Sequence, residues 1–346
     1  MTAAATGQSA LNPDVREAAR AVLGRMEPAG AADRGLDSET WDRLARSGFT
    51  LLGIDEQHGG SGGTLRDLAA VVYEAAYACA ALPVVETAWL AGPWLTLLDT
   101  DPGPGPATAA VAPGVRVDDG GTATGTVRHV PALRWSRSVA LLTGGEQPRL
   151  ALVDPSGSGV RAEERANLAG EPRDTLVLHD APVHWVAADA GEADQHRLRG
   201  ALARSVQLAA AAQRVLDRTL AHVRERHQFG RPVSAFQAVQ HRLAAIAGDV
   251  VVMHAAVEAA VAGWADRADD ADFLVAVAKA ETSWRAGRVA SAGHQLHGAI
   301  GFTLEHDLGA ATKRLWSWRE EFGNEGAWRP HVAAAVGEHL WEVVTR

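Results

Sequence analysis

The spacing of apolar residues along the chain changes twice. From residue 1 to about residue 100, Ala-rich apolar stretches have helical character and are interrupted at DEQHGGSGGT, residues 55–64. The segment SETWDRLARSGF is expected to begin a helix capped by Asp37 or Ser38. Thr64 is expected to cap a second long helix, TLRDLAAVVYEAAYACAAL. This pattern predicts a helical N-terminal domain.

Short apolar runs replace the helical pattern from about residue 106 to about residue 190. Four of them are SVALLT, RLALVD, DTLVLHD and PVHWV, separated by Gly and Pro. Runs of this length between turn residues are typical of β-strands. The Pro- and Gly-rich segment DTDPGPGPATAAVAPG stands at the start of this region and marks a boundary. We therefore expect a small β domain here.

Helical spacing returns after about residue 195. Apolar residues recur every three or four positions on both sides of QFGRP: Val206, Ala209, Ala212, Leu216, Leu220 and Val223 before it, and Val239, Leu243, Ile246, Val250, Met253, Val257 and Val261 after it. A further helix is expected to end at Gly298. Long helices with one apolar stripe each are typical of a bundle. The expected fold is mainly α with a small central β domain: an N-terminal helical domain at 1–105, a middle β domain at 106–195 and a C-terminal helical bundle at 196–346.

The composition is that of an ordinary soluble protein of 346 residues, with 47% hydrophobic and 22% charged residues. Its formal net charge of -9 argues against a dedicated nucleic-acid-binding protein. Cys79 is the single cysteine, which excludes an intrachain disulfide and a thiolate metal cluster. The first residues lack the apolar core of a signal peptide, and no run approaches the ~20 apolar residues of a membrane span. We expect a cytoplasmic protein without a membrane span.

Three common motifs are weak or absent. GGSGG, residues 59–63, matches the nucleophile-elbow pattern with Ser61 as its serine, but a glycine loop between two helices explains it more simply. No G-x-G-x-x-G follows a strand, so a Rossmann dinucleotide site has no support. The 14 histidines include no H-E-x-x-H, and the bundle has no Glu-x-x-His pair, so no metal site is expected.

A basic cluster stands out in HVRERHQFGRPVSAFQAVQ, residues 222–240. One interpretation is a cationic helix end that complements the helix dipole, with Gly230 as terminator and Pro232 just beyond. That interpretation explains the positive charges. It does not explain why Phe229 lies among them or why glutamines follow. An anion site with an apolar neighbour and amide donors is an equally economical description, so both remain open from the residues alone.

Several segments in the same order resemble the acyl-CoA dehydrogenase family. RERHQFGRPVSAFQAVQHRLA is similar to the family's arginine, Phe-Gly and glutamine signature. WDRLARSGFTLLGIDEQHGGSGGTLRDLAAVVYE resembles its N-terminal helix, acidic-Gly-Gly loop and following helix, and ETSWRAGRVASAGHQLHGAIGFTLEHDL resembles its late helix. The resemblance covers nearly the whole chain. It implies an N-terminal helical domain, a middle β-barrel-like domain and a C-terminal four-helix bundle.

The resemblance also implies a flavoprotein that removes two hydrogens from the α and β carbons of an acyl-CoA thioester. In the family a carboxylate takes the α proton and FAD accepts the β hydride. The arginine before Phe-Gly reaches the FAD pyrophosphate of a neighbouring subunit, and the glutamine of the late helix approaches the adenosine half. The matching positions here are Arg226, Gln228, Phe229 and Gln237, and Gln295 with Gly298.

The catalytic base departs from the family pattern. Counting without gaps, the position of the usual glutamate before a glycine falls on Phe322, and the alternative position on the helix before the arginine motif falls on Gly200. Glu321 is the nearest carboxylate to the first position and is the candidate base, with Glu320 and Glu325 close by. A solvated helix end is an equally good interpretation of this charged stretch.

The flavin-ring half of the site also departs from the pattern. The middle domain lacks the family's Thr-Glu-Pro and Gly-Ser-Asp stretches, and only Trp135 and Ser136 resemble its tryptophan strand. Ala299 stands where a second glycine is usual. These features together resemble the short partner subunit of heterotetrameric (α2β2) acyl-CoA dehydrogenases of actinobacterial steroid degradation.

Three functions are compatible with these observations. The first is a partner subunit that completes an FAD site shared with a homologous catalytic subunit, acting on an acyl-CoA substrate. The second is a self-sufficient homo-oligomeric acyl-CoA dehydrogenase with Glu321 as base. The third is a non-catalytic assembly subunit. The acyl group does not follow from the sequence.

Overall fold

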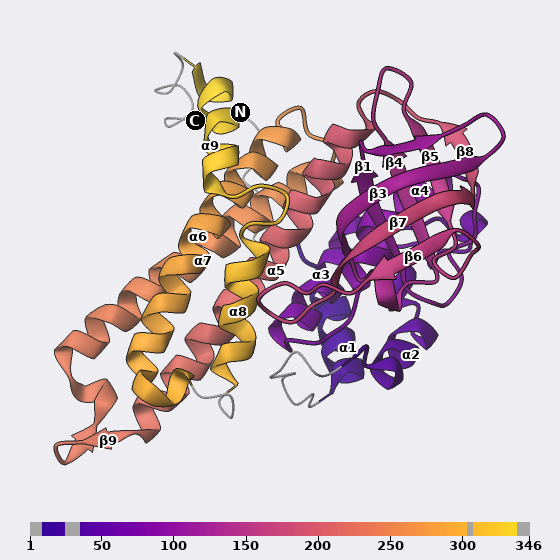
Figure 1. Ribbon diagram of the computed structural model, residues 1–346. Helices are drawn as coiled ribbons and strands as arrows, with labels where there is room; N and C mark the ends of the chain where they lie inside the picture. The colour runs from indigo at the N-terminus through magenta and orange to yellow at the C-terminus, as the bar shows by residue number, and fades with distance from the viewer. Residues whose placement is uncertain (1–8, 25–34, 303–306, 338–346) are drawn as a thin grey trace.

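The computed structural model describes residues 9–24, 35–302 and 307–337. The described part forms a helical N-terminal region, a β domain packed beside it and a long helical bundle (Figure 1). One hydrophobic core joins the N-terminal helices to the bundle, and a second, smaller core lies inside the β domain. The expected fold class, mainly α with a small central β domain, is confirmed.

The N-terminal region consists of short helices around one long buried helix. Its elements are α1 (Pro13–Leu23), α2 (Ser38–Arg46), η1 (Phe49–Leu51), η2 (Glu56–His58), α3 (Leu65–Tyr77), η3 (Val85–Ala91) and α4 (Gly92–Leu97). Both predicted caps are confirmed. The Asp37 carboxylate accepts from the Thr40 backbone N–H, and Thr64 forms a capping box with Asp67. Ser61 lies in the loop between η2 and α3, so the nucleophile-elbow alternative is wrong.

The β domain consists of two four-stranded sheets that enclose a small apolar core. The strands are β1 (Ala107–Ala112), β2 (Val115–Val117), β3 (Thr122–Pro131), β4 (Ser138–Thr143), β5 (Arg149–Val153), β6 (Val160–Glu163), β7 (Arg173–Pro182) and β8 (His184–Ala187), with η4 (Leu133–Trp135) between β3 and β4. Their orders are β1-β4-β5-β8 and β2-β3-β7-β6. All four predicted strand runs lie in or overlap observed strands. Each run has apolar residues that face the interior and turn residues on either side, which is the pattern of a short strand.

The bundle is built from long antiparallel helices and a small hairpin. Its elements are α5 (Glu192–Glu225), β9 (His227–Gln228), β10 (Arg231–Pro232), η5 (Val233–Ala235), α6 (Gln237–Ala265), α7 (Ala271–His297), η6 (Gly298–Phe302), α8 (Leu308–Trp318) and α9 (Glu325–Val336). Gly298 caps α7 with φ 68°, as expected. The interpretation in which Gly230 terminates the preceding helix is wrong in that detail. The helix ends at Glu225, and Gly230 lies in the turn of the hairpin, where its φ of 76° is suited to glycine.

The expectation of a chain without a membrane span stays a prediction, and among the described residues α6 is the helix that bears on it. This helix is long and apolar enough to pass such a test, with a mean hydropathy of 1.6 in its best window, although only 39% of that window is buried. Length and composition alone are weak support for a span, because core helices of soluble proteins meet the same criterion. In this fold α6 packs against α7 and α5 in the bundle (Figure 1).

Candidate cofactor site and active-site region

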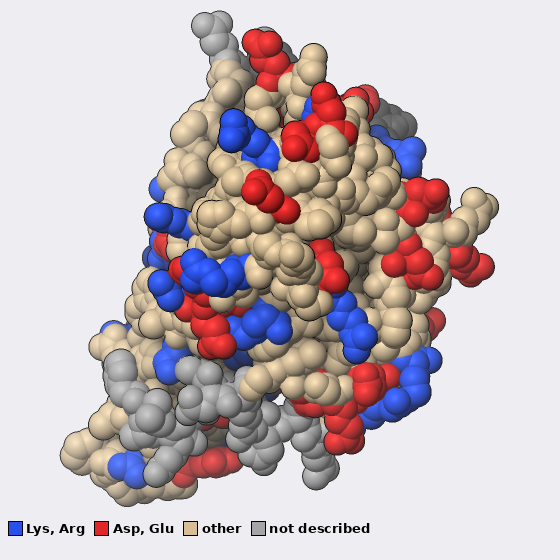
Figure 2. Space-filling model, turned by 45° about the vertical axis from the view of Figure 1, so that its right-hand side comes forward, with Lys and Arg blue, Asp and Glu red and all other residues tan. Residues whose placement is uncertain are grey.

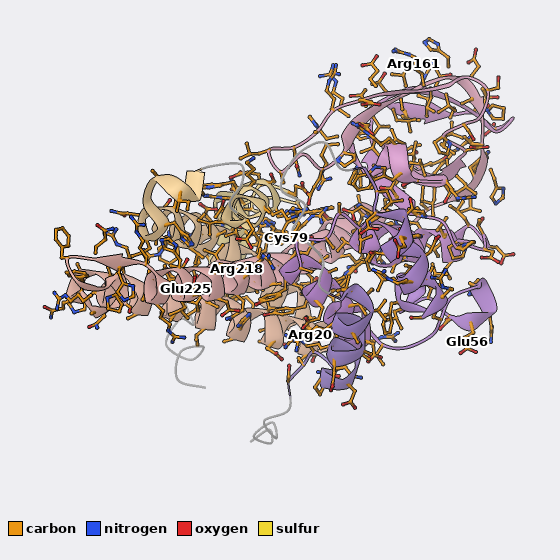
Figure 3. The ribbon with its side chains drawn as sticks, turned by 90° about the horizontal axis from the view of Figure 1, so that it is seen from below. Arg20, Glu56, Cys79, Arg161, Arg218 and Glu225 are labelled. Atoms are coloured by element: carbon orange, nitrogen blue, oxygen red, sulfur yellow. The ribbon has the colours of Figure 1, made fainter. Side chains whose placement is uncertain are left out.

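The end of the bundle farthest from the β domain carries the predicted cofactor residues. α5 ends at Glu225, and Arg226 is its C-cap residue. The β9–β10 hairpin follows, with Phe229 and Gly230 in its turn, both at positive φ. Figure 1 shows β9 at the extremity of the molecule, and Figure 3 shows Glu225 at the opposite end from Arg161 of the β domain. The sequence motif therefore forms a protruding hairpin.

The start of α6 and the end of α7 lie at the same end of the bundle as this hairpin. Gln237 is the first residue of α6 and follows the hairpin and η5. The ring of His297, the last residue of α7, stacks on His222 near the end of α5, with 4.4 Å between ring centroids. Gln295 is exposed on the last turn of α7, and Gly298 follows as its cap. All six predicted cofactor residues therefore lie at the same end of the bundle.

The side chains of the hairpin are exposed and suited to bind an anion beside an aromatic ring. Phe229 is 91% exposed, and its ring meets Phe236 edge-on at a centroid distance of 6.1 Å. The guanidinium of Arg231 lies 4.1 Å from the centroid of the Phe236 ring. Among the described residues, no carboxylate forms an ion pair with Arg226 or Arg231. Both cations can therefore pair with a ligand's negative charge.

The two positions that match the family's base face each other in the interior. A Cβ atom placed on Gly200 of α5 would lie 2.3 Å from Cδ1 and Cε1 of Phe322, so the phenyl ring lies directly on the α5 backbone. The same ring lies 5.8 Å from the ring of His196, which stacks on Trp94 at 4.2 Å. Burial, with a smaller contribution from Arg199, lowers the pKa of His196 to about 3, so this imidazole is neutral. An apolar ring therefore occupies the space between the two base positions.

Glu321, the candidate base, is bound by two arginines. Arg173 of β7 contacts it through two nitrogens, at 2.9 Å to Oε1 and 3.0 Å to Oε2. Nε of Arg204 on α5 donates to Oε2 at 2.8 Å. Burial by itself favours the neutral acid, but Arg173 and Arg204 outweigh it, and the pKa of the Glu321 carboxyl lies below its ordinary value. A carboxylate with both oxygens engaged and a lowered pKa is a poor proton acceptor.

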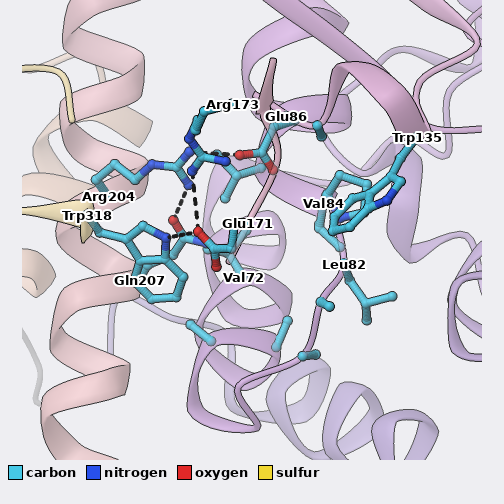
Figure 4. Close-up of a pocket in the computed structure, with 17 residues that line it drawn as sticks. Val72, Leu82, Val84, Glu86, Trp135, Glu171, Arg173, Arg204, Gln207 and Trp318 are labelled. Atoms are coloured by element: carbon cyan, nitrogen blue, oxygen red, sulfur yellow. Dashed lines mark hydrogen bonds and ion pairs between the residues drawn. The ribbon is translucent and has the colours of Figure 1, made fainter. Parts of the chain in front are cut away.

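The same ion pairs extend to the N-terminal region and to α8. Arg204, only 1% exposed, also donates to Glu86 of η3 at 2.7 Å. Glu171, which precedes β7, accepts from Arg314 at 3.1 Å and from the Trp318 indole N–H at 2.8 Å. Burial alone would raise the pKa of Glu171, but Arg314 and Arg173 together bring it down to about 2. Figure 4 shows Glu86, Arg204, Arg173 and Glu171 converging from the N-terminal region, the bundle and the β domain.

The cavity beside these ion pairs is small. Its walls include Val72, Leu82, Trp135, Glu86, Arg204 and Gln207, and its volume is about 30 Å³ (Figure 4). That is room for about one or two water molecules, whereas sites for organic ligands measure roughly 300–1,000 Å³. A larger hollow of about 560 Å³ opens on the other side of Glu321, between the β domain and α8, and includes Leu168, Trp316 and Phe322 in its walls. The ion pairs thus fill the junction beside the small cavity, whereas the larger hollow has the volume of a ligand site.

Comparison with known proteins identifies the family. The model of the acyl-CoA dehydrogenase N-terminal domain matches residues 6–96, and that of the acyl-CoA dehydrogenase C-terminal domain matches residues 197–336. The acyl-CoA dehydrogenase IpdE2 of Mycobacterium tuberculosis is 30% identical over 295 residues, which is 84% of each chain. The chain belongs to the acyl-CoA dehydrogenase family.

Solved structures of acyl-CoA dehydrogenases share this fold. The ChsE4-ChsE5 complex from Mycobacterium tuberculosis superposes with a TM-score of 0.85 at 22% identity, over 96% of this chain and 98% of that one. The butyryl-CoA dehydrogenase of Megasphaera elsdenii has a TM-score of 0.83 at 16% identity, over 97% of this chain and 100% of the butyryl-CoA dehydrogenase chain. The chain therefore has an acyl-CoA dehydrogenase fold over nearly its whole length.

Acyl-CoA dehydrogenases are FAD-dependent oxidoreductases, so FAD is the cofactor that the site has to fit. The bundle end fits the pyrophosphate and adenosine part, because it offers unpaired arginines, amide side chains and an exposed ring. The interior does not provide the catalytic carboxylate that acyl-CoA dehydrogenases place beside the flavin ring. It presents no carboxylate at Phe322 or Gly200, and the adjoining Glu321 is held by arginines.

The sequence did not reveal the ion pairs around Glu321. Arg204, Arg173 and Glu86 come from three separate regions, and their pairing depends on the tertiary fold. One signal was available for Arg204, which lies in the Ala-rich stretch GALARSVQLAAAA. A charged residue inside an otherwise apolar helix predicts a buried ion-pair partner, because an unpaired buried charge is very costly.

Proposed function

We propose that this chain is the partner subunit of a heteromeric FAD-dependent acyl-CoA dehydrogenase. The flavin ring and the catalytic base belong to a homologous second subunit. This chain contributes the bundle end, with Arg226, Gln228, Phe229 and Gln237 on one side and Gln295 with Gly298 on the other. Both subunits act together in the α,β-dehydrogenation of an acyl-CoA thioester in the cytoplasm.

The contact between Phe322 and Gly200 carries this proposal. Abstraction of a proton from the α carbon requires a carboxylate within hydrogen-bonding reach of that proton. The family offers two positions for it, and here both are apolar and packed against each other. Glu321 is the nearest alternative, but its charge is neutralised by Arg173 and Arg204. A self-sufficient enzyme with Glu321 as base is therefore disfavoured.

The exposure of the bundle end also supports a shared cofactor. Phe229 is almost completely exposed and protrudes with the hairpin, away from the chain's own β domain (Figure 1). An exposed aromatic residue beside unpaired arginines is suited to a ligand presented by another subunit. FAD supplies the hydride acceptor when it is bound. The role of Arg226 is to neutralise the pyrophosphate, while Gln228 and Gln295 donate amide hydrogens and Phe229 covers an apolar surface.

The outer face of α6 supports assembly with other subunits. Val251 is 65% exposed and its neighbour Val252 is 37% exposed, in a helix whose other exposed residues include Ala244, Gly248 and Ala255. An apolar helical face of this kind is usually covered in the assembled protein. We propose an α2β2 heterotetramer, in line with the ChsE4-ChsE5 and Tcur3481-Tcur3483 complexes, two structures of paired chains that share this fold.

The proposed substrates are steroid-derived acyl-CoA thioesters. The structure of Tcur3481-Tcur3483, described as a steroid acyl-CoA dehydrogenase, superposes with a TM-score of 0.83 at 23% identity over 94% of this chain and 98% of that one. That relationship suggests the substrate class for the heteromer. The residues that select the acyl group belong to the catalytic subunit in this proposal.

The test is the absorbance spectrum and activity of the chain with and without its partner. We expect the purified chain alone to lack stoichiometric flavin absorbance near 450 nm and to turn over no acyl-CoA. We expect the complex with an acyl-CoA dehydrogenase from the same genome to hold FAD and to be active. Stoichiometric FAD together with turnover by the chain alone would refute the proposal.

Arg226→Ala tests the cofactor contact within the complex. A charge-assisted contact to a phosphate is worth ~1.5–3 kcal/mol, so FAD should dissociate about 10- to 150-fold more readily. Arg224→Ala is the matched control, because Arg224 is an exposed arginine on a different face of the same helix end. Equal FAD affinity in the Arg226 and Arg224 variants would contradict the assigned role.

A further inference from the structure

Two tryptophans are partly exposed side by side on the bundle. Trp284 of α7 and Trp316 of α8 are each 37% exposed. A Cβ atom on Gly287 of α7 would lie 3.2 Å from Cη2 of Trp316, so this indole lies across α7 one turn after Trp284. Tryptophan is usually well buried in a single folded chain, and two partly exposed indoles on adjoining helices indicate a binding surface.

Arginines surround both indoles. The guanidinium groups of Arg285, Arg288 and Arg329 lie 4.9, 5.0 and 5.8 Å from the ring centroid of Trp284. Arg319 lies 5.4 Å from the centroid of Trp316. Trp and Arg are the residue types most enriched among the few side chains that dominate protein–protein binding. These stacked contacts also hold both ring systems in place before any partner arrives.

The charges of this surface favour a protein over a nucleic acid. Arg285 and Arg288 both bind the carboxylate of Asp249, at 2.6 and 2.9 Å. Arg319 pairs with Glu325 at 2.6 Å. Figure 2 shows acidic and basic side chains interspersed on the face it presents. Phosphate backbones require an excess of unpaired cations, whereas protein interfaces combine aromatic anchors with locally paired charges.

The apolar surface continues from α8 to the β domain. Trp316 forms part of the wall of the 560 Å³ hollow, together with Leu168 of the loop before β7. Leu168 is 64% exposed. Trp284, Trp316 and Leu168 therefore form one row that crosses the junction between the bundle and the β domain, with a hollow beside it that can receive a side chain.

This row is continuous with the proposed cofactor end. Trp284, Arg288, Ser291 and Gln295 are all exposed and are spaced four, three and four residues apart, so they share one stripe of α7. Eleven residues at 1.5 Å each put Trp284 roughly 16 Å from Gln295 along the helix. A standard interface buries ~800 Å² per partner, which corresponds to a patch about 30 Å across. A subunit that presents FAD to Gln295 is therefore wide enough to cover Trp284 as well.

We infer that the row formed by Trp284, Trp316 and Leu168, with the arginines around the two indoles, is the docking surface for the FAD-bearing partner subunit. This inference rests on the proposed function, since the partner is the subunit whose FAD reaches Gln295. Trp284 and Trp316 are the central anchors, and Leu168 extends the contact to the β domain.

The test measures association of the chain with a homologous acyl-CoA dehydrogenase from the same genome, purified with its FAD. Trp284→Ala and Trp316→Ala are each titrated against that partner by isothermal calorimetry, and the mass of each mixture is measured by light scattering. Central anchor residues contribute a large share of the binding free energy. Each variant should therefore bind at least about 30-fold more weakly than the wild-type chain. Circular dichroism checks that each variant is folded.

Trp185→Ala is the matched control. Trp185 lies on β8, is also partly exposed, and has the guanidinium of Arg149 3.9 Å from its ring centroid. It lies outside the proposed surface, so its variant should bind the partner like the wild-type chain. A loss of binding in all three variants would indicate a general effect of removing an indole and would overturn the inference.

The remaining outcomes separate the inference from the proposed function. If the wild-type chain binds its partner and the Trp284 and Trp316 variants bind equally well, the docking surface is wrong while the partner-subunit function stands. If the wild-type chain binds no such partner, both are wrong. If the chain alone self-associates and Trp284→Ala abolishes that self-association, the surface belongs to a homo-oligomer and the inference is overturned.

Discussion

Replacing Glu321 with glutamine separates two roles for this carboxylate. In the structure it binds Arg173 and Arg204, which come from the β domain and from α5. If its role is to join these regions, Glu321→Gln weakens folding and leaves turnover of the assembled enzyme near the wild-type value. If it is the catalytic base, the same change abolishes turnover of the assembled enzyme.

The size of the stability loss follows from the ion pairs. Breaking a buried ion pair by removing one partner typically costs 3–5 kcal/mol, because a buried charge is left without compensation. Here Arg204 keeps Glu86 and Arg173 keeps Glu171, and the side chain of Glu321 is 20% exposed. We therefore expect a smaller loss of about 2–3 kcal/mol in the free energy of unfolding. For a chain of 346 residues that corresponds to a decrease in Tm of roughly 3–4 °C.

The measurement is a thermal and urea denaturation of the isolated chain by circular dichroism, paired with steady-state turnover of the complex. Glu39→Gln is the control, because Glu39 forms an exposed ion pair with Arg43 at 3.0 Å and such pairs contribute ~0.5 kcal/mol or less. A Glu321→Gln variant that melts like the wild-type chain, in a complex without turnover, would refute the structural role and restore Glu321 as the base.

Three further predictions use other parts of the chain. Gly200→Ala should destabilise the fold by about 1–3 kcal/mol through its clash with the Phe322 ring, and by clearly less in a Phe322→Ala background, as a double-mutant cycle of urea midpoints would reveal. Acid should unfold the chain in two overlapping ranges. The folded-state pKa of His196 is lowered from 6.5 to about 3, and that of Glu171 is lowered from 4.5 to about 2. The unfolded state therefore binds more protons, and the free energy of unfolding falls as the pH decreases through each interval. A His196→Phe variant should lose the first contribution in melts between pH 7 and 3. Val251→Asp should reduce the mass of the assembly measured by light scattering while the chain stays folded, and an unchanged mass would exclude the outer face of α6 from the interface.

Local signals in the sequence were sufficient for most elements. Asp37 and Thr64 cap helices as predicted, because a cap depends on a side chain and backbone N–H groups two or three residues away. SVALLT is a strand over the same six residues, Ser138–Thr143. The end of α5 was placed wrongly, because the glycine at 230 serves the turn of a hairpin whose two strands contain only two residues each. Such a short hairpin has no periodicity to detect.

The high mean hydropathy of α6 is not visible as an uninterrupted run of apolar residues. α6 has few charges and many alanines and valines, but its polar residues are spread widely enough that no long uninterrupted apolar run appears in the sequence. Averaged over a window its hydropathy is high. Only the packing of α6 against α5 and α7 reveals which of its residues are buried and that Val251 and Val252 are left exposed.

The sequence by itself determined the family, the three-part architecture and the motif centred on Arg226, because these depend on residue types at short, regular spacings. It also indicated that both base positions lack a carboxylate. Only the tertiary structure decided what replaces that carboxylate. It places Phe322 on Gly200, 122 positions earlier in the chain, and binds Glu321 between arginines of the β domain and of α5. The pKa of a carboxyl group depends on the charges and the solvent around it, and those are supplied by distant segments that only folding brings together.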